Sequence, residues 1–122
     1  MGSQKKFLSL NCKGLASTRK KIALKRVVQV QKLDIIILQE TLGTEEEVSR
    51  VLSSISSSFT FLAHSAKGHS GGLAIAWNTT MLHCENPWEA SFGMGLEIFW
   101  EEPNLHLNLI NIYGSQYKPL SF

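Results

Sequence analysis

The sequence predicts an α/β fold in which two helices lie on one face of a mixed β-sheet. Two observations lead to this fold class: two strand-and-helix units precede the serine-rich stretch 53–58, and the residues after it contain only strand-like runs. A chain of 122 residues is long enough for one modest domain, which would bury roughly two thirds of the surface that its unfolded form exposes. We therefore expect a single domain over residues 1–122.

The first unit consists of a short strand and a basic helix. Residues 7–11 form an apolar stretch that predicts a strand, and a helix is expected to begin after a cap at Ser17 or Thr18. Four aliphatic residues fall at three- and four-residue intervals on one side of this helix: Ala23, Leu24, Val27 and Val28. That spacing predicts a helix whose aliphatic side packs on a sheet.

The second unit has the clearest local signals. Residues 34–38 form a largely β-branched run, which is typical of a strand covered on both faces. Gln39, Glu40 and Thr41 follow, so Glu40 is predicted at the carboxyl end of that strand. Thr44 and Glu47 form a capping box. Apolar residues repeat at helical spacing behind it, at Val48, Val51, Leu52 and Ile55.

The rest of the chain is predicted to be a β meander that completes the mixed sheet. Residues 59–63 and 73–77 are expected to form strands, with a loop at 64–72 between them. Residues 96–100 and 105–113 are the clearest later strands. Glu102, Pro103 and Asn104 are expected to form a hairpin turn between these two.

Cysteine content and hydropathy predict an intracellular protein. Cys12 and Cys84 are too few for a disulfide framework, and no Cys or His spacing indicates a zinc site. The amino terminus has no apolar signal core, and no run approaches the roughly 18 apolar residues that span a bilayer. We expect reduced, buried thiols, a nuclear or cytoplasmic location and no contact with membranes.

Charge is distributed unevenly along the chain. Residues 1–32 contain nine Lys or Arg and no acidic residue, although the net charge of the chain is only +2. Such a block attracts nucleic-acid phosphate, but it is also typical of the solvated face of a helix. If it binds nucleic acid, the expected contacts are Lys20, Lys21, Lys25 and Arg26.

Three polar residues, Asn11, Glu40 and Tyr113, each close a strand-like run. Strand ends are where sites usually form in layered α/β folds. A carboxylate at the end of a buried strand costs desolvation free energy unless a cation or hydrogen-bond donors meet it, and a hard divalent ion does this well. Glu40 is therefore a candidate metal ligand. The alternative is that it caps the following loop or pairs with a lysine.

Four segments match one family in order and in spacing: residues 11–15, 34–41, 70–77 and 111–114. With them the chain resembles the endonuclease domain of plant non-LTR (LINE-type) retrotransposons. That domain belongs to the endonuclease/exonuclease/phosphatase superfamily, with apurinic endonucleases, DNase I and inositol-phosphate phosphatases. The resemblance covers about residues 7–114. It implies a partial four-layer α/β sandwich and a Mg²⁺-dependent phosphodiesterase that acts on DNA.

The resemblance also implies a role for each candidate residue. Glu40 would bind the catalytic Mg²⁺, Asn11 would form hydrogen bonds within the site, and Tyr113 would direct its hydroxyl at the scissile phosphate. In the family, an Asp-x-Asn motif and an Asp-His pair follow the tyrosine, but residues 114–122 contain neither Asp nor His. We therefore expect a C-terminally truncated domain that is inactive alone. It should expose apolar sheet surface and self-associate through it.

Two other functions have some support in the sequence. Residues 68–72 match the G-x-S-x-G elbow of serine hydrolases, with Ser70 as nucleophile and Glu97 and His106 as partners. That elbow requires a helix after the turn, whereas residues 73–77 predict a strand, so the glycines are expected to form a tight loop. The second is a non-catalytic nucleic-acid-binding module that uses the basic helix.

The histidines are expected to be polar loop or strand-face residues. All four, His64, His69, His83 and His106, precede Tyr113. None therefore occupies the position of the histidine that ends the family's active site.

Overall fold

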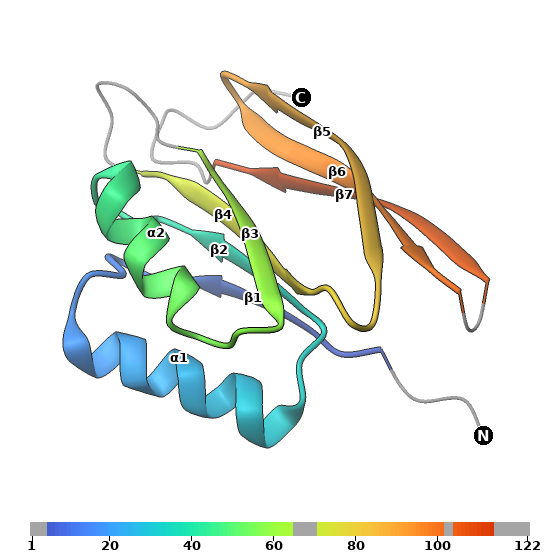
Figure 1. Cartoon of the computed structure of the whole chain (residues 1–122). Coiled ribbons are helices and arrows are strands. Elements are labelled where there is room, and N and C mark those ends of the chain that lie inside the picture. The colour runs from blue at the N-terminus through green and yellow to red at the C-terminus, as the bar shows by residue number, and fades with distance from the viewer. Residues whose placement is uncertain (1–4, 65–70, 102–103, 114–122) are drawn as a thin grey trace.

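The computed structural model describes residues 5–64, 71–101 and 104–113. The elements in chain order are β1 (Phe7–Asn11), α1 (Thr18–Gln31), β2 (Ile35–Gln39), α2 (Glu45–Ser53), β3 (Phe59–His64), β4 (Leu73–Asn78), β5 (His83–Ala90), β6 (Gly93–Trp100) and β7 (Leu105–Ile112). They form three layers, with the two helices on one face of a four-stranded sheet and a three-stranded sheet on the other (Figure 1). The predicted fold class is confirmed.

The four-stranded sheet, sheet A, has the strand order β1-β2-β4-β3. β1 is parallel to β2, and β4 runs antiparallel to both β2 and β3. β2 is a central strand with both faces covered. Ile36 and Leu38 pack in the cluster beneath the helices, and Ile35 packs in the cluster on the other face. This double burial explains why β2 is apolar from Ile35 to Leu38.

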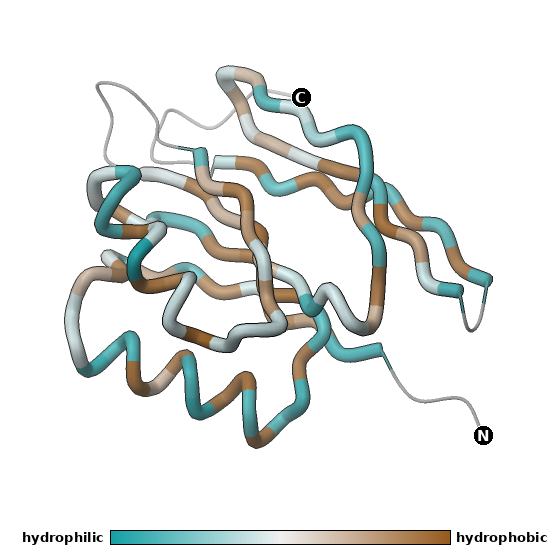
Figure 2. The backbone as a smooth tube through the Cα atoms, viewed as in Figure 1, coloured by the Kyte–Doolittle hydropathy of each residue, from teal (hydrophilic) through white to brown (hydrophobic). Residues whose placement is uncertain are grey.

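Helix α1 begins where its cap predicts. The Ser17 hydroxyl accepts a hydrogen bond from the Lys20 backbone N–H at 3.2 Å. Leu24 and Val28 are buried, but Ala23 is exposed, so the buried stripe is narrower than the sequence predicted. Hydrophobic and hydrophilic residues alternate along the whole helix in Figure 2. The helix therefore rests on sheet A through one narrow line of side chains.

Helix α2 is held by the predicted capping box. The Glu47 backbone N–H donates to the Thr44 hydroxyl at 3.1 Å, and the Thr44 backbone N–H donates to the Glu47 carboxylate at 3.2 Å. The four predicted core residues of this segment, Val48, Val51, Leu52 and Ile55, are all buried.

The later strands do not extend the mixed sheet, and this corrects the sequence prediction. β5, β6 and β7 form a separate antiparallel sheet, sheet B, with β6 in the centre. Alternate residues of β6, including Leu96 and Ile98, are buried in the same cluster as Ile35, Leu73 and Ile75 of sheet A. A second sheet forms because the face of sheet A opposite the helices is itself apolar and has to be covered.

Strand β5 was not identified from the sequence. It contains Asn86 and Pro87, and its register with β6 shifts between Glu85 and Trp88. Proline within a strand is tolerated at edges and bulges, and β5 is an edge strand with such an irregularity. A strand of this kind lacks the period-two pattern that would reveal it.

The outer face of sheet B carries exposed apolar side chains. Ile110 and Ile112 are each 57% exposed, and Phe92, in the turn between β5 and β6, is 59% exposed. The uncovered apolar surface that the sequence led us to expect therefore lies on sheet B. Sheet A, in contrast, is covered on both faces. The helices of the described segments are too short and too polar to cross a bilayer.

Candidate active site

Two of the predicted residues lie where β1 and β2 end, at the same end of sheet A. The strands are parallel, and Asn11, the last residue of β1, pairs with Gln39, the last residue of β2. Glu40 follows with a positive φ of 51°, a conformation that is uncommon for residues other than glycine. Its carbonyl accepts a hydrogen bond from the Gly14 N–H at 2.8 Å. Asn11 and Glu40 therefore lie at neighbouring strand ends.

The third predicted residue, Tyr113, reaches the same end of sheet A from sheet B. Asn111, two residues earlier, is only 2% exposed. Its amide nitrogen donates to the carbonyls of Leu38 and Ala74 at 3.1 and 3.2 Å, and its side-chain oxygen accepts from Gln39 Nε2 at 3.0 Å. Asn111 thus fastens the end of β7 to the edge formed by β2 and β4, and Tyr113 follows directly after it.

Asn11 is on the face of sheet A that looks toward sheet B. Gln39 Nε2 also donates to the Ser9 hydroxyl at 3.2 Å, and residues two apart on a strand point to the same face. The side-chain oxygen of Asn11 accepts from the Lys13 backbone N–H at 3.2 Å. One function of Asn11 is therefore to shape the turn that follows β1.

His64 contacts the predicted catalytic tyrosine. It ends β3, its Nδ1 lies 3.3 Å from the Tyr113 hydroxyl, and the two rings are 5.7 Å apart between centroids. A histidine in this position can fix the orientation of a phenol or exchange a proton with it. This contact cannot be predicted from the sequence, because no local pattern relates two residues that are 49 positions apart, one at the end of β3 and the other just after β7.

Charged groups surround the loop between Asn11 and α1. Lys20 Nζ donates to the carbonyls of Cys12 and Lys13 at 2.8 and 2.7 Å. The pKa of the Cys12 thiol is raised to about 11, first by burial, which outweighs the nearby Lys20 ammonium, and further by the Glu40 carboxylate. The Glu40 carboxylate thus acts electrostatically on a buried thiol directly after Asn11.

The prediction for the cysteines is confirmed in part. Both Cys12 and Cys84 are free, and Cys12 is buried, whereas Cys84 is half-buried. Burial raises the pKa of Cys84 to about 12.

The four residues predicted to bind nucleic acid do not share one face of α1. Lys20 is engaged with the loop carbonyls at the site. Lys21 and Lys25 are four residues apart and lie on one face, whereas Arg26 borders a shallow hollow with Arg19 on another. Binding of DNA through these residues stays a prediction, and Lys20 has a structural function in addition.

The described residues fit a Mg²⁺ ion only in part. They contain no group of three or more His, Cys, Asp or Glu side chains that could hold a metal. Mg²⁺ is commonly bound through one or two carboxylates, with water and substrate phosphates as the remaining ligands. Glu40 can supply one carboxylate, so the site requires further ligands before it would hold the ion.

The serine-hydrolase alternative is not supported. Ser70 and His69 lie outside the described residues, but the element after the glycines is strand β4 and not the helix that the elbow requires. Glu97 and His106 do form a contact of 3.1 Å, on the outward face of sheet B. A Cβ atom on Gly72 would overlap the Thr41 hydroxyl, so this glycine allows the tight passage that the sequence predicted.

Comparison with known proteins identifies the fold. No protein-family model matches the sequence, and no curated protein matches it. Among solved structures, the AP endonuclease LMAP from Leishmania major aligns with a TM-score of 0.66 and 19% identity, over 89% of this chain and 40% of that one. The fold is a partial endonuclease/exonuclease/phosphatase sandwich.

Two further structures of this superfamily agree. The mannosyl-6-phosphatase Bt3783 of Bacteroides thetaiotaomicron VPI-5482 aligns with a TM-score of 0.69 and 11% identity, over 89% of this chain and 51% of that one. A humanized D. rerio TDP2 with 14 mutations aligns with a TM-score of 0.63 and 16% identity, over 90% of this chain and 48% of that one. The chain thus spans between 40% and 51% of the length of these three proteins.

Proposed function

We propose that this chain carries part of the active site of a Mg²⁺-dependent DNA endonuclease of the retrotransposon type. The single observation behind the proposal is that the ends of β1, β2 and β7 lie at the same end of sheet A. Asn11 and Glu40 are at the ends of the neighbouring strands β1 and β2, and Tyr113 is beside His64 at the end of β3. The retrotransposon type and the DNA substrate are supported by the four sequence segments that resemble that family. A nuclear or cytoplasmic location belongs to the same proposal.

The three residues have complementary functions in this proposal. Glu40 would contact Mg²⁺, which neutralises negative charge that grows on the phosphate oxygens during cleavage. Asn11 and Tyr113 are neutral hydrogen-bond donors that would hold the phosphodiester in line. His64 would keep the Tyr113 hydroxyl in place, since the two groups lie within 3.3 Å.

The 122 residues are proposed to be inactive by themselves. Cleavage needs a base that deprotonates the attacking water, and the Asp-x-Asn and Asp-His motifs that supply it in the family are not present after Tyr113. We therefore propose that the site binds the metal and the phosphodiester but does not cleave the phosphodiester. Supercoiled plasmid incubated with the protein and Mg²⁺ should remain intact. Nicking that disappears in Glu40→Ala would contradict the inactivity.

Binding can be tested with Mn²⁺, a paramagnetic ion that takes the same oxygen ligands as Mg²⁺. In the presence of a dinucleotide, Mn²⁺ should broaden the backbone NMR signals of Asn11, Gly14 and Glu40. Glu40→Gln should abolish this effect, whereas Glu97→Gln, on the outward face of sheet B, should leave it unchanged. Broadening limited to the exposed acidic residues 45–47, or unaffected by Glu40→Gln, would refute the proposal.

A non-catalytic nucleic-acid-binding module is the second candidate, because α1 lies in the outer layer and exposes Lys25 and Arg26. The test neutralises Lys21, Lys25 and Arg26 and keeps Lys20, which holds the loop after β1. If the module binds DNA through α1, affinity should fall and its dependence on salt should become shallower. An unchanged affinity and salt slope would exclude it.

A further inference from the structure

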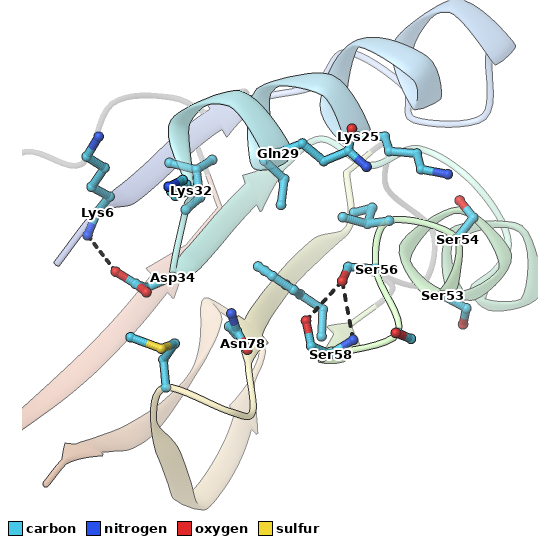
Figure 3. Close-up of a pocket in the computed structure, with 16 residues that line it drawn as sticks. Lys6, Lys25, Gln29, Lys32, Asp34, Ser53, Ser54, Ser56, Ser58 and Asn78 are labelled. Atoms are coloured by element: carbon cyan, nitrogen blue, oxygen red, sulfur yellow. Dashed lines mark hydrogen bonds between the residues drawn. The ribbon is translucent and has the colours of Figure 1, made fainter.

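A cavity lies at the end of sheet A opposite to Glu40. It has a volume of about 860 Å³ and is bordered by Lys6 before β1, Asp34 before β2, Phe59 at the start of β3 and Asn78 at the end of β4. The last turns of α1 and the 53–58 segment close its sides (Figure 3). Because the strands of sheet A are five or six residues long, roughly 15 to 20 Å of sheet separate this cavity from the candidate active site.

The cavity has an apolar floor. Its apolar lining residues come from three separate segments of the chain: Val28 and Leu33, Ile55 and Phe59, and Met81. Val28, Leu33 and Ile55 belong to the cluster beneath the helices, and Phe59 packs against that cluster. Met81 is 42% exposed. Because Val28, Leu33 and Ile55 are at most 7% exposed, a flat apolar ligand would contact chiefly Phe59 and Met81. The volume is within the 300 to 1,000 Å³ that is usual for small-molecule sites.

The rim of the cavity is cationic. Lys6, Lys25 and Lys32 line it together with one carboxylate, Asp34, which gives a net charge of +2. Asp34 is only 6% exposed and accepts a hydrogen bond of 2.9 Å from the Lys6 backbone N–H. In Figure 3 the three lysines are spread along the rim, with Lys6 and Lys32 near Asp34 and Lys25 at the other end, toward Ser54. Both helices end near the cavity, and their carboxyl ends carry partial negative charge. The three lysines are therefore the groups of the lining that favour an anion, and Lys32, the C-cap of α1, offsets the negative end of that helix.

Neutral polar groups lie on the side opposite the lysines. The hydroxyls of Ser56 and Ser58 are 2.9 Å apart, and the Ser58 N–H donates to Ser56 Oγ at 3.3 Å. The side-chain oxygen of Asn78 accepts from the N–H and the hydroxyl of Thr80 at 3.0 and 2.7 Å. This leaves the amide nitrogen of Asn78 turned toward the pocket (Figure 3).

We propose that this cavity binds a nucleoside phosphate. The phosphate would lie at the lysines, because lysine binds phosphate as a compact positive charge, and a dianionic group matches the net charge of the lining. The base would lie on the apolar floor around Phe59, since aromatic side chains stack with any base. Ser58 and Asn78 can then form hydrogen bonds with polar groups of the base or sugar.

This proposal goes beyond the proposed function and does not depend on it. None of the three candidate active-site residues, Asn11, Glu40 and Tyr113, lines the cavity. Glu40→Gln should consequently leave nucleotide binding unchanged. The two proposals can therefore fail separately.

Calorimetric titration of the whole chain with AMP, adenosine and inorganic phosphate tests the proposal. AMP should bind saturably, and adenosine and inorganic phosphate should each bind at least about tenfold more weakly. Lys25→Gln and Lys32→Gln should weaken AMP binding about five- to tenfold. Lys21→Gln is the matched control, since it removes the same charge from the same helix outside the cavity.

Three results would overturn the proposal. The first is AMP binding that does not saturate up to roughly 10 mM. The second is an equal loss of affinity in Lys21→Gln and Lys25→Gln, which would indicate attraction by overall charge alone. The third is inorganic phosphate that binds as tightly as AMP. Met81→Ala tests the apolar floor. Because Met81 is partly exposed, the variant is expected to fold. It should weaken the binding of AMP and leave the binding of inorganic phosphate unchanged.

Discussion

Gln39 donates a hydrogen bond of 3.0 Å to Asn111, and this bond joins the end of β2 in sheet A to the end of β7 in sheet B. Asn111 completes its hydrogen bonds with the carbonyls of Leu38 and Ala74. The candidate active site is built around this connection, because it brings Tyr113 to the edge that carries Asn11 and Glu40. The first prediction concerns Asn111 itself.

Replacement of Asn111 by Asp should destabilise the protein by about 3 kcal/mol, because a buried carboxylate cannot donate to the Leu38 and Ala74 carbonyls and is costly to desolvate. Urea unfolding followed by tryptophan fluorescence measures the loss. Asn108→Asp is the matched control, since Asn108 lies on the same strand with its side chain exposed. Equal losses in the two variants would contradict the function assigned to Asn111.

The reactivity of Cys12 should report the charge of Glu40. The Glu40 carboxylate contributes to the raised pKa of Cys12, about 11, so Glu40→Gln should lower that pKa. In metal-free buffer, the rate of alkylation of Cys12 by iodoacetamide at about pH 10 should therefore increase. Cys84, whose pKa of about 12 is raised by burial alone, serves as the internal control. An unchanged rate at Cys12 would show that the two groups are not close.

The same thiols predict how stability depends on alkaline pH. Their pKa values are higher in the folded than in the unfolded protein. The protonated thiols therefore stabilise the fold fully below the ordinary value of about 9, and this contribution is lost as the pH rises toward 11 and 12. Replacement of both by Ser should flatten the fall in the urea midpoint between about pH 8 and 10. A curve identical to that of the wild type would count against this assignment.

The capping box of α2 should account for about 1 kcal/mol, measured as the effect of Thr44→Ala on urea unfolding at neutral pH. The pKa of Glu47 is lowered by its hydrogen bonds with the Thr44 backbone and side chain. A lowered pKa contributes stability above the ordinary value and loses it as the pH falls through the folded value. The effect of Thr44→Ala should therefore shrink at about pH 3. Glu46→Gln is the control, because it removes a neighbouring carboxylate and leaves the capping box intact. In that background the effect of Thr44→Ala on stability should still become smaller as the pH falls.

Gly95 should not tolerate a side chain. A Cβ atom there would lie 2.6 Å from the Leu109 carbonyl oxygen and 2.7 Å from the Trp88 ring. Gly95→Ala is expected to cost about 2 to 3 kcal/mol and to change the fluorescence of Trp88. Gly43→Ala is the matched control, because the nearest atom to its Cβ would be at 3.5 Å, and it should fold normally. A stable Gly95→Ala variant would show that sheet B adapts more than its packing suggests.

Self-association should occur through the outer face of sheet B, where Phe92, Ile110 and Ile112 are exposed. Sedimentation should show species larger than the monomer as concentration rises, and Ile110→Lys should shift them to the monomer. Ile22→Lys introduces the same charge at an exposed apolar position of α1 and should have no such effect. A wild-type protein that remains monomeric would refute the prediction.

Short-range signals in the sequence identified most of the elements. The caps at Ser17 and Thr44 depend on hydrogen bonds within three residues, and β2 is recognisable because a strand buried on both faces must be apolar throughout. Asn11 and Glu40 were located at strand ends for the same reason, since the apolar runs stop there. Their functions, with that of Tyr113, stay predictions.

By itself the sequence determined the two strand-and-helix units and the strand ends at Asn11 and Glu40, because caps and apolar periodicity act over a few residues. Only the tertiary structure decided that β5, β6 and β7 form a second sheet, that Asn111 contacts Gln39 across 72 positions, and that His64 meets Tyr113 across 49. These contacts depend on which apolar faces cover each other, and that choice is made by packing over the whole chain.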